Sequence, residues 1–437
     1  MSWKKVKIGD LCIIEKGAIG ILKAIPGEYP MVVTSEERKS HNEYQFDDEA
    51  VIIPLVSSTG HGHKSLKRIH FQKGKFAVGS ILCAVIPKNK AQLSAEYLYR
   101  FLDLNKENEL VARMKGMANV TLPMKEIAQI EIPLPPLNEQ NAFVEKHKNL
   151  ETQSTYLDTE LTHQLDLVKK LRQQFLQEVV QGKLIRNEEL EIRNTEGVGE
   201  TGAALLERIK AEKVKTGKKE KPLLPIKEDE IPFDIPDNWV WCRLGEIVNH
   251  IFDGPFGSHL KSSDYTESGV QVLRLENLGE MKFKHEKQTF VSHKKYETIS
   301  QHRVYEGDII IGSFLADGVK CVILPKLENI AIAKADCFCI RINHPLFLKE
   351  YAQFLLSSKP MFLELSSLLR GMTRLRINTT QLKSLPVPLP PLSIQAQIVT
   401  KVEELMGLCD ALEAGIRASK GVNEALLQQV LREALAG

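Results

Sequence analysis

The sequence predicts an α+β protein in which two globular domains are joined by two long helices that form an antiparallel coiled coil. Residues 116–180 align without a gap with residues 371–435, and both stretches contain Pro-Leu-Pro-Pro-Leu, at 133–137 and 388–392. A long run with apolar residues at seven-residue spacing follows each segment, as in helices that pair along a seam. The duplication therefore also predicts internal pseudo-twofold symmetry.

The duplication and the composition place the boundaries of the parts. We expect a first globular domain at 1–137, a first long helix at 138–181, a charged, proline-containing connector at 182–238, a second globular domain at 239–392 and a second long helix at 393–437. The domains begin alike, at Trp3 and Trp239, but differ strongly between these starts and the repeated segments. The connector is long enough for the second helix to run back along the first, and a short helix is expected at 202–213.

Within each domain, β-rich runs precede one or two helices, an order that is typical of α+β folds. In the first domain we expect strands at 29–34, 50–56 and 79–86 and a helix at 94–104 with Ser94 as its N-cap. In the second domain we expect strands at 271–275, 307–312 and 320–324 and a helix at 348–357.

The long helices carry apolar residues in a heptad pattern. The predicted seam consists of Leu150, Leu157, Leu161 and Leu171 in the first helix and Leu405, Leu412, Ile416 and Leu426 in the second. Gln164 and Ser419 interrupt it at equivalent places, and polar seam residues fix register at a cost in stability. Since a helix of about 40 residues is roughly 60 Å long, the pair is expected to act as a spacer between the domains.

The composition excludes several classes of protein. The net charge is only +2 over 437 residues, so a nucleic-acid binder of this kind must confine its basic surface to a local site. No stretch reaches the roughly 18 apolar residues of a membrane span, and residues 1–5 do not resemble a signal peptide. We therefore expect a cytoplasmic protein. The seven cysteines lack the paired spacing of a zinc site, which favours reduced, buried thiols.

The sequence contains no convincing catalytic constellation. A phosphate-binding P-loop and a Gly-x-Gly-x-x-Gly turn are both lacking. Residues 253–256 (Asp-Gly-Pro-Phe) are only superficially similar to the Asp/Asn-Pro-Pro-Tyr/Phe motif of DNA amino-methyltransferases, because the second position is glycine. His61 and His63 have no third ligand nearby, so we expect no metal site. A stand-alone DNA adenine methyltransferase nevertheless remains the alternative function.

Several glycine-containing loops combine the residue types that contact DNA phosphates and base edges. The candidates in the first domain are Thr59, His61, His63, Lys64, Arg68, Lys115 and Asn119. The candidates in the second domain are Ser258, Lys261, Arg274, Asn277, Arg370, Thr373 and Arg374. The cluster at 370–376 is the strongest basic cluster in either domain.

Further features occur in a fixed order along nearly the whole chain. The Pro-Leu-Pro-Pro-Leu segments continue to Gln140 and Gln395, the first helix closes with Gln-Gly-Lys-Leu at 181–184, and Asp-Gly-Pro-Phe-Gly-Ser occupies 253–258. Each feature alone is a weak signal. Together with the duplicated helices and the paired Trp starts, the ordered set resembles the specificity subunits of type I DNA restriction–modification systems.

The resemblance implies that each globular domain is a target-recognition domain that reads one half of a bipartite, asymmetric site in double-stranded DNA. The helices would set the spacing of the half-sites and dock two modification (methyltransferase) subunits. The resemblance also implies a chain without catalysis or cofactors of its own. S-adenosylmethionine is expected on the modification subunits, and ATP and Mg on the partner restriction (translocase and nuclease) subunits.

Overall fold

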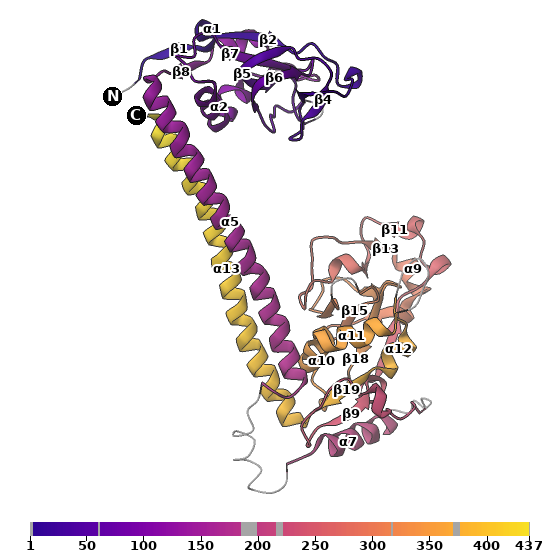
Figure 1. Ribbon diagram of the computed structural model, residues 1–437. Coiled ribbons are helices and arrows are strands. Elements are labelled where there is room, and N and C mark those ends of the chain that lie inside the picture. The colour runs from indigo at the N-terminus through magenta and orange to yellow at the C-terminus, as the bar shows by residue number, and fades with distance from the viewer. Residues whose placement is uncertain are drawn as a thin grey trace. The chain divides into compact units, whose positions relative to one another are not determined.

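The computed structural model describes residues 3–59, 62–184, 199–215, 222–315, 318–369 and 376–436. The chain divides into two compact units, one of Met1–Gln164 with Gly415–Gly437 and one of Leu165–Ala414, called unit 1 and unit 2 here. Each unit contains one mixed α/β domain and a stretch of both long helices (Figure 1). The domain of unit 1 is called head one (residues 3–136) and that of unit 2 head two (residues 239–391). The predicted α+β class with two domains and two long helices is confirmed.

Head one is built on a six-stranded sheet. Its strand order is β2 (Cys12–Lys16), β7 (Leu82–Pro87), β5 (Phe46–Pro54), β6 (His70–Val78), β3 (Tyr29–Val32) and β4 (Lys39–His41). Only the β3–β6 pair is parallel among these neighbours. Both faces are buried, because Val51 and Ile53 pack with Leu98 of the following helix while Ile52 packs with Phe76 on the opposite face.

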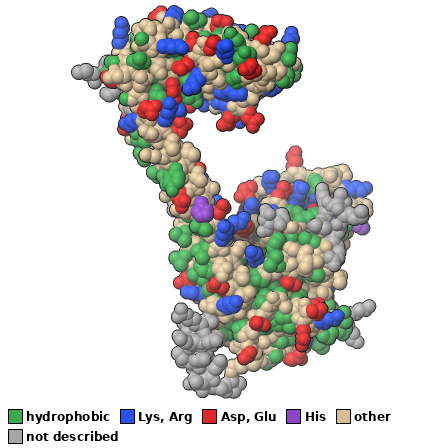
Figure 2. Space-filling view, viewed as in Figure 1, with side chains coloured by type: hydrophobic (Ala, Val, Ile, Leu, Met, Phe, Trp, Pro, Cys, Tyr) green, Lys and Arg blue, Asp and Glu red, His purple; other side chains and the backbone are tan. Residues whose placement is uncertain are grey.

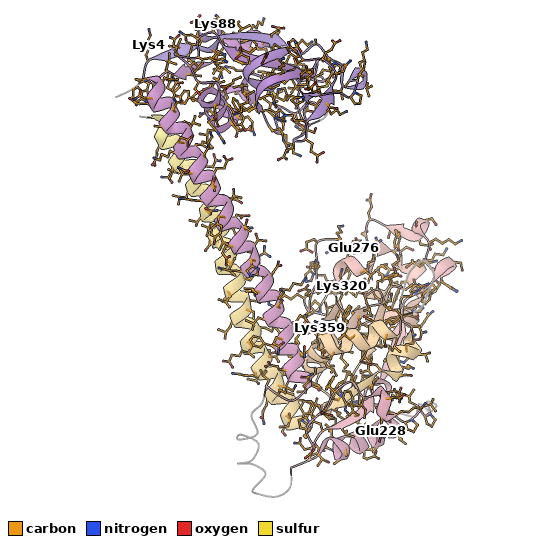
Figure 3. All side chains as sticks on the ribbon, viewed as in Figure 1. Lys4, Lys88, Glu228, Glu276, Lys320 and Lys359 are labelled. Atoms are coloured by element: carbon orange, nitrogen blue, oxygen red, sulfur yellow. The ribbon has the colours of Figure 1, made fainter. Side chains whose placement is uncertain are left out.

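A small frame of strands and helices links the sheet of head one to the long helix. It consists of β1 (Lys5–Lys7), α1 (Ile8–Leu11), α2 (Ala95–Leu104), α3 (Lys106–Glu109), α4 (Met124–Ala128) and β8 (Glu131–Pro133). Strands β1 and β8 pair antiparallel. Ser94 caps α2 as predicted, since its side chain accepts a hydrogen bond from the Tyr97 amide at 3.4 Å. Lys88, labelled in Figure 3, donates from Nζ to the carbonyl oxygens of Gly9 (2.9 Å) and Asp10 (3.1 Å) in α1.

Head two contains two sheets. The first has the order β10 (His250–Asp253), β18 (Cys337–Arg341), β15 (Ile309–Gly312) and β16 (Cys321–Ile323). The second has the order β11 (Tyr265–Thr266), β13 (Phe290–Val291), β12 (Val270–Leu273), β17 (Ala331–Ala333) and β14 (Arg303–Val304). Side chains alternate in β15 as they do in β5: Ile309 and Ile311 pack into one core, and Ile310 packs into another.

The frame of head two repeats the frame of head one. Its elements are β9 (Val240–Arg243), α8 (Leu244–Ile247), α10 (Lys349–Ser357), α11 (Lys359–Ser367), α12 (Thr379–Ser384) and β19 (Pro386–Leu389), whereas α9 (His293–Glu297) lies between β13 and β14. Strands β9 and β19 pair antiparallel, as β1 and β8 do. The short helix expected before head two is present as α7 (Gly202–Lys215). Leu205 and Ile209 of α7 are buried in the head-two core, so this part of the connector is folded onto the domain.

The two long helices are α5 (Leu137–Val180) and α13 (Leu392–Ala436). In unit 1 the side-chain amide of Asn423 donates to the carbonyl oxygen of Ser154 at 3.0 Å, and the Lys420 ammonium lies 2.9 Å from the Asp158 carboxylate. Residue numbers on α13 therefore fall as those on α5 rise, which makes the helices antiparallel. In unit 2 the Arg172 guanidinium contacts Asp410 and Glu413 of α13, both at 2.6 Å.

The contact between the helices differs in detail from the predicted seam. Leu161 is buried, and three more of the predicted residues are half-buried: Leu150, Leu405 and Ile416. The other four lie outside the seam and are 43, 38, 52 and 56% exposed: Leu157, Leu171, Leu412 and Leu426. This corrects the predicted register. Charged residues that directly follow three of these leucines form ion pairs between the helices instead: Asp158 pairs with Lys420, and Arg172 pairs with Glu413.

All seven cysteines are buried free thiols, as the sequence predicts, and burial raises their pKa; for Cys83 on β7 the pKa is about 12.

In the part of the chain that the structure describes, no helix combines the length and apolar character needed to cross a membrane.

Candidate DNA-recognition sites

In head one the structure brings two of the predicted loops together. The Ser57 amide donates to the carbonyl oxygen of Val120 at 3.0 Å, and Thr121 forms bridges with both Val56 and Lys115. Loop 57–65 therefore lies beside loop 115–121. Five candidates are exposed on these loops: Thr59, His63, Lys64, Lys115 and Asn119. His61 lies outside the described residues.

Two cations of head one already have acidic partners. The Lys115 ammonium lies 2.7 Å from the Glu126 carboxylate, and this hydrogen bond lowers the pKa of Glu126. The Arg68 guanidinium pairs with the Glu36 carboxylate, which belongs to neither loop, at 2.8 Å. A bound phosphate would compete with these carboxylates, which are on average weak partners at an exposed surface.

In head two the candidates Ser258 and Lys261 are exposed. Ser258 lies within a short 3₁₀ turn (Gly257–His259), and Lys261 directly precedes a second one (Ser262–Asp264). The Asp264 carboxylate accepts a hydrogen bond from the Lys261 amide at 2.7 Å and lies 3.0 Å from the Lys295 ammonium, so its pKa is lowered. This bonding fixes the backbone that presents Lys261. The turn is therefore preorganised for a contact made by that side chain.

Two further candidates of head two are engaged within the protein. Arg274 pairs with Glu276 at 3.2 Å, and Glu276, labelled in Figure 3, also lies 3.6 Å from the Lys287 ammonium. Asn277 is only 1% exposed: its Oδ1 accepts from the Arg274 amide, and its Nδ2 donates to the carbonyl oxygens of Lys284 and Lys287. The predicted DNA contact for Asn277 is thus corrected to a structural role. Arg370, Thr373 and Arg374 lie outside the described residues.

Head two contains a hollow of about 380 Å³ that the sequence analysis did not predict. Its lining combines acidic, hydroxyl, basic, amide and aromatic side chains: Asp253, Phe256, Ser313, Ala335, Phe338, Arg376, Ile377 and Asn378. This set is called the head-two pocket below. Two signals in the sequence lay close to it, the Asp-Gly-Pro-Phe motif at 253–256 and the basic cluster that ends at Arg376.

The backbone of each head places its candidate site at the same point of the fold. In head one, Leu55 donates from its amide to Ile81 and accepts from the Leu122 amide. In head two, Ser313 donates to Asp336 and accepts from the Ile377 amide in the same way. Leu122, which follows loop 115–121, and Ile377, which follows Arg376, therefore hold equivalent backbone positions in the two heads. Equivalent frames therefore present different side chains.

Charge is distributed without a single dominant sign. Figure 2 shows acidic and basic side chains interspersed on the visible faces of the protein, in keeping with a net charge of +2. Among the residues that the structure describes, no three His, Cys, Asp or Glu side chains gather in a way that could hold a metal ion. Binding of a polyanion would therefore depend on local groups, such as the loop residues above.

The chain is similar to specificity subunits of type I restriction enzymes. The profile of the type I restriction modification DNA specificity domain matches residues 1–167 and 236–419. The chain is 27% identical over 301 residues to the type I restriction enzyme EcoEI specificity subunit of Escherichia coli, covering 67% of this chain and 49% of that protein. It is 25% identical over 454 residues to the EcoDI specificity subunit of Escherichia coli, covering 100% of this chain and 88% of that protein.

One solved structure has the same fold over the full chain. It comes from work on complex assembly and conformational transition of the type I R-M system, and it matches with a TM-score of 0.63 at 17% identity, covering 100% of this chain and 98% of that one. The match to EcoEI, by contrast, spans about half of that subunit's length. These similarities favour a specificity component and give no support to a stand-alone DNA adenine methyltransferase.

Proposed function

The chain belongs to the family of type I restriction modification DNA specificity domains, and from this premise we propose that it is the DNA-reading subunit of a type I restriction–modification complex. Each head reads one half of a bipartite, asymmetric site in double-stranded DNA. The chain itself is not an enzyme and binds no cofactor. S-adenosylmethionine belongs to the two modification subunits, and ATP and Mg belong to the restriction subunits with which the complex assembles in the cytoplasm.

The observation that carries the proposal is the repetition of one frame with different surfaces. Buried glutamines at the start of each long helix bind equivalent groups: Gln140 accepts from the Ser94 amide at 2.8 Å, and Gln395 accepts from the Leu348 amide at 2.9 Å. The loops that these frames present differ in length and residue type. Two like scaffolds with unlike surfaces suit two unlike half-sites, because direct base readout depends on which donors and acceptors a surface offers.

The exposed leucines of the long helices are proposed to dock the modification subunits. Unit 1 exposes Leu157 of α5 and Leu426 of α13, and unit 2 exposes the residues aligned with them, Leu412 of α13 and Leu171 of α5. Figure 2 shows apolar side chains at the surface of the helix pair. Each unit thus carries an equivalent apolar site, here called a leucine site, and two equivalent sites suit two copies of one partner.

The domain boundaries predicted from the sequence are part of this proposal. Residues 1–137 and 239–392 form the two target-recognition domains, 138–181 and 393–437 the spacer helices, and 182–238 the connector. The paired helices set the distance between the half-sites, so the gap in the DNA motif follows from helix length.

The test is co-expression of the chain with a cognate modification subunit, followed by sequencing of methylated DNA. We expect adenine methylation at a split motif with two unlike halves. Replacing Thr59 and Lys64 of head one by alanine should relax or weaken one half only, since a good base contact contributes roughly 1–3 kcal/mol. Lys90→Ala is the matched control, because Lys90 pairs with Asp48 outside the two loops.

A methylome without any split motif would sink the proposal. Calorimetry of the isolated chain with S-adenosylmethionine separates it from the alternative. A stand-alone methyltransferase must bind the cofactor, whereas a specificity subunit gives no heat of binding.

A further inference from the structure

The head-two pocket has a rigid acidic wall. Asp253 is the last residue of β10, where it pairs with Phe338 of β18, and its carbonyl oxygen accepts a hydrogen bond from Nδ1 of His302 at 2.5 Å. The next residue, Gly254, has no room for a side chain, because a Cβ there would lie 2.2 Å from the carbonyl oxygen of Ala333. The backbone that carries the carboxylate is therefore clamped from both sides. Among the described residues, no cation forms an ion pair with this carboxylate.

A buried hydroxyl lines the same pocket. Ser313 is 1% exposed, and both of its backbone groups are used: the amide donates to Asp336 at 2.9 Å, and the carbonyl accepts from Ile377 at 3.3 Å. Its Oγ has no hydrogen-bond partner in the part of the chain that the structure describes. An unpaired buried hydroxyl destabilises the free protein, because the hydrogen bond it made to water in the unfolded chain is not replaced. A ligand that bonds to this group in the pocket would remove that penalty.

Head one lacks this chemistry at the equivalent positions. Lys16 pairs with Cys83 at the end of β2 as Asp253 pairs with Phe338 at the end of β10. Leu55 occupies the backbone position of Ser313, as its hydrogen bonds to Ile81 and Leu122 establish. The common frame therefore does not require an acid or a hydroxyl here. Their presence in head two alone points to a function that is specific to that head.

We propose that Asp253 and Ser313 form a specificity pocket that binds the exocyclic amino group of a cytosine or an adenine in the half-site read by head two. An ionised carboxylate only accepts hydrogen bonds, and a serine hydroxyl can accept one as well as donate one. The pair thus selects a donor, and the N4 amino group of cytosine and the N6 amino group of adenine are the donors that bases present in the major groove. Phe256 and Arg376 at the exposed rim would contact the neighbouring apolar and phosphate groups.

This inference rests on the proposed function and is tested in the same complex. Asp253→Asn exchanges one acceptor oxygen for a donor with little change of shape, and Ser313→Ala removes the hydroxyl. Each variant, co-expressed with the modification subunit, should lose discrimination at one base pair of the head-two half by about 5- to 150-fold, the equivalent of 1–3 kcal/mol. The other half and the gap should stay unchanged. Loss at a G·C pair assigns cytosine, and loss at an A·T pair assigns adenine.

Two matched controls separate recognition from folding. Glu267→Gln makes the same chemical change at an exposed acid of head two outside the pocket and should leave the motif intact. Ser358→Ala removes a buried hydroxyl that donates to the carbonyl oxygen of Leu355 at 2.7 Å. It should lower the unfolding midpoint and leave the motif intact, whereas Ser313→Ala should keep or raise the midpoint and change the motif.

The outcomes distinguish failure of the specificity pocket from failure of the proposed function. A wild-type complex without a split motif contradicts the proposed function. A split motif that both pocket variants read with unchanged discrimination overturns the specificity pocket and leaves the proposed function standing. A lowered unfolding midpoint for Ser313→Ala together with an unchanged motif would also overturn it, because the hydroxyl would then be structural.

Discussion

The side-chain amide of Gln140 donates a hydrogen bond to the carbonyl oxygen of Pro135 at 2.9 Å, five residues earlier, where the chain turns into α5. Gln395 makes the same bond to Pro390 at 3.1 Å at the start of α13. Both glutamines are fully buried. The proline-rich segments are therefore held to the helices that follow them by side-chain bonds as well as by the stiffness of proline.

We predict that Gln140→Leu destabilises head one by about 1–3 kcal/mol, because the Ser94 amide and the Pro135 carbonyl lose a buried partner. Gln395→Leu should have an equal effect on head two. Urea unfolding followed by fluorescence measures both. Gln153→Leu, an exposed change of the same kind on α5, is the control. Equal midpoints for Gln140→Leu and the control would contradict a structural role for the buried amide.

Head one should lose stability in mild acid through His70. Burial, and then the charges of Arg38 and Arg68, lower the pKa of His70 to about 4. Nδ1 lies 3.1 Å from the Arg38 guanidinium and so accepts its hydrogen bond, which requires a neutral ring. Since the unfolded pKa is about 6.5, the unfolded state binds the proton first. The stabilisation of head one by the neutral His70 ring is complete above pH 6.5 and is lost as the pH falls toward 4.

The expected loss is at most about 3 kcal/mol over this interval. Unfolding free energies measured between pH 7 and pH 4 test it, with His70→Asn as the comparison, because an asparagine oxygen can still accept from Arg38 and does not titrate. The variant should show a flatter pH profile than the wild-type chain. Parallel profiles would show that other groups carry the acid sensitivity.

The leucine sites predict the stoichiometry of the complex. Leu157→Ser with Leu426→Ser should remove one modification subunit, and Leu171→Ser with Leu412→Ser should remove the other. Because these side chains are exposed in the free chain, the changes should hardly affect its stability. Native mass spectrometry of the co-expressed complex reads the ratio directly. Leu22→Ser, at a fully exposed leucine of head one, is the control and should keep two partners per chain.

Arg243 should hold residues 222–230 against head two. The buried guanidinium donates to the carbonyl oxygens of Leu224 (3.1 Å), Pro225 (3.1 Å) and Ser384 (2.7 Å) and pairs with Glu230 at 2.8 Å. The hydrogen bond from Arg243 is the main cause of the lowered pKa of Glu230. Arg243→Ala leaves these acceptors unpaired.

We expect Arg243→Ala to destabilise the domain by about 2–5 kcal/mol. It should also open a cleavage site for limited proteolysis before Trp239. Glu230→Gln keeps a hydrogen-bonding partner for the guanidinium and should have a smaller effect on both measurements. A protease pattern for Arg243→Ala identical to that of the wild-type chain would show that the segment is held by other contacts.

The sequence by itself determined the duplicated plan, the α+β class, the two long helices and the cap at Ser94. These follow from local patterns, since a repeated segment, a seven-residue periodicity and an N-cap can each be read from neighbouring residues. The expectation of reduced, buried cysteines followed from their positions in the sequence, which lack the paired spacing of a zinc site.

Only the tertiary structure decided which faces meet and which side chains share a pocket. The heptad pattern placed Leu157 and Leu412 in the seam, but an apolar stripe does not reveal which of its residues face the other helix and which lie at the surface. The charged residues next to them form the ion pairs between the helices instead. From the sequence, Asn277 is expected at the surface as a polar residue, but in the structure the surrounding turn buries its side chain. Asp253 and Ser313 are 60 positions apart, and only the pairing of β10, β18 and β15 brings them to one pocket.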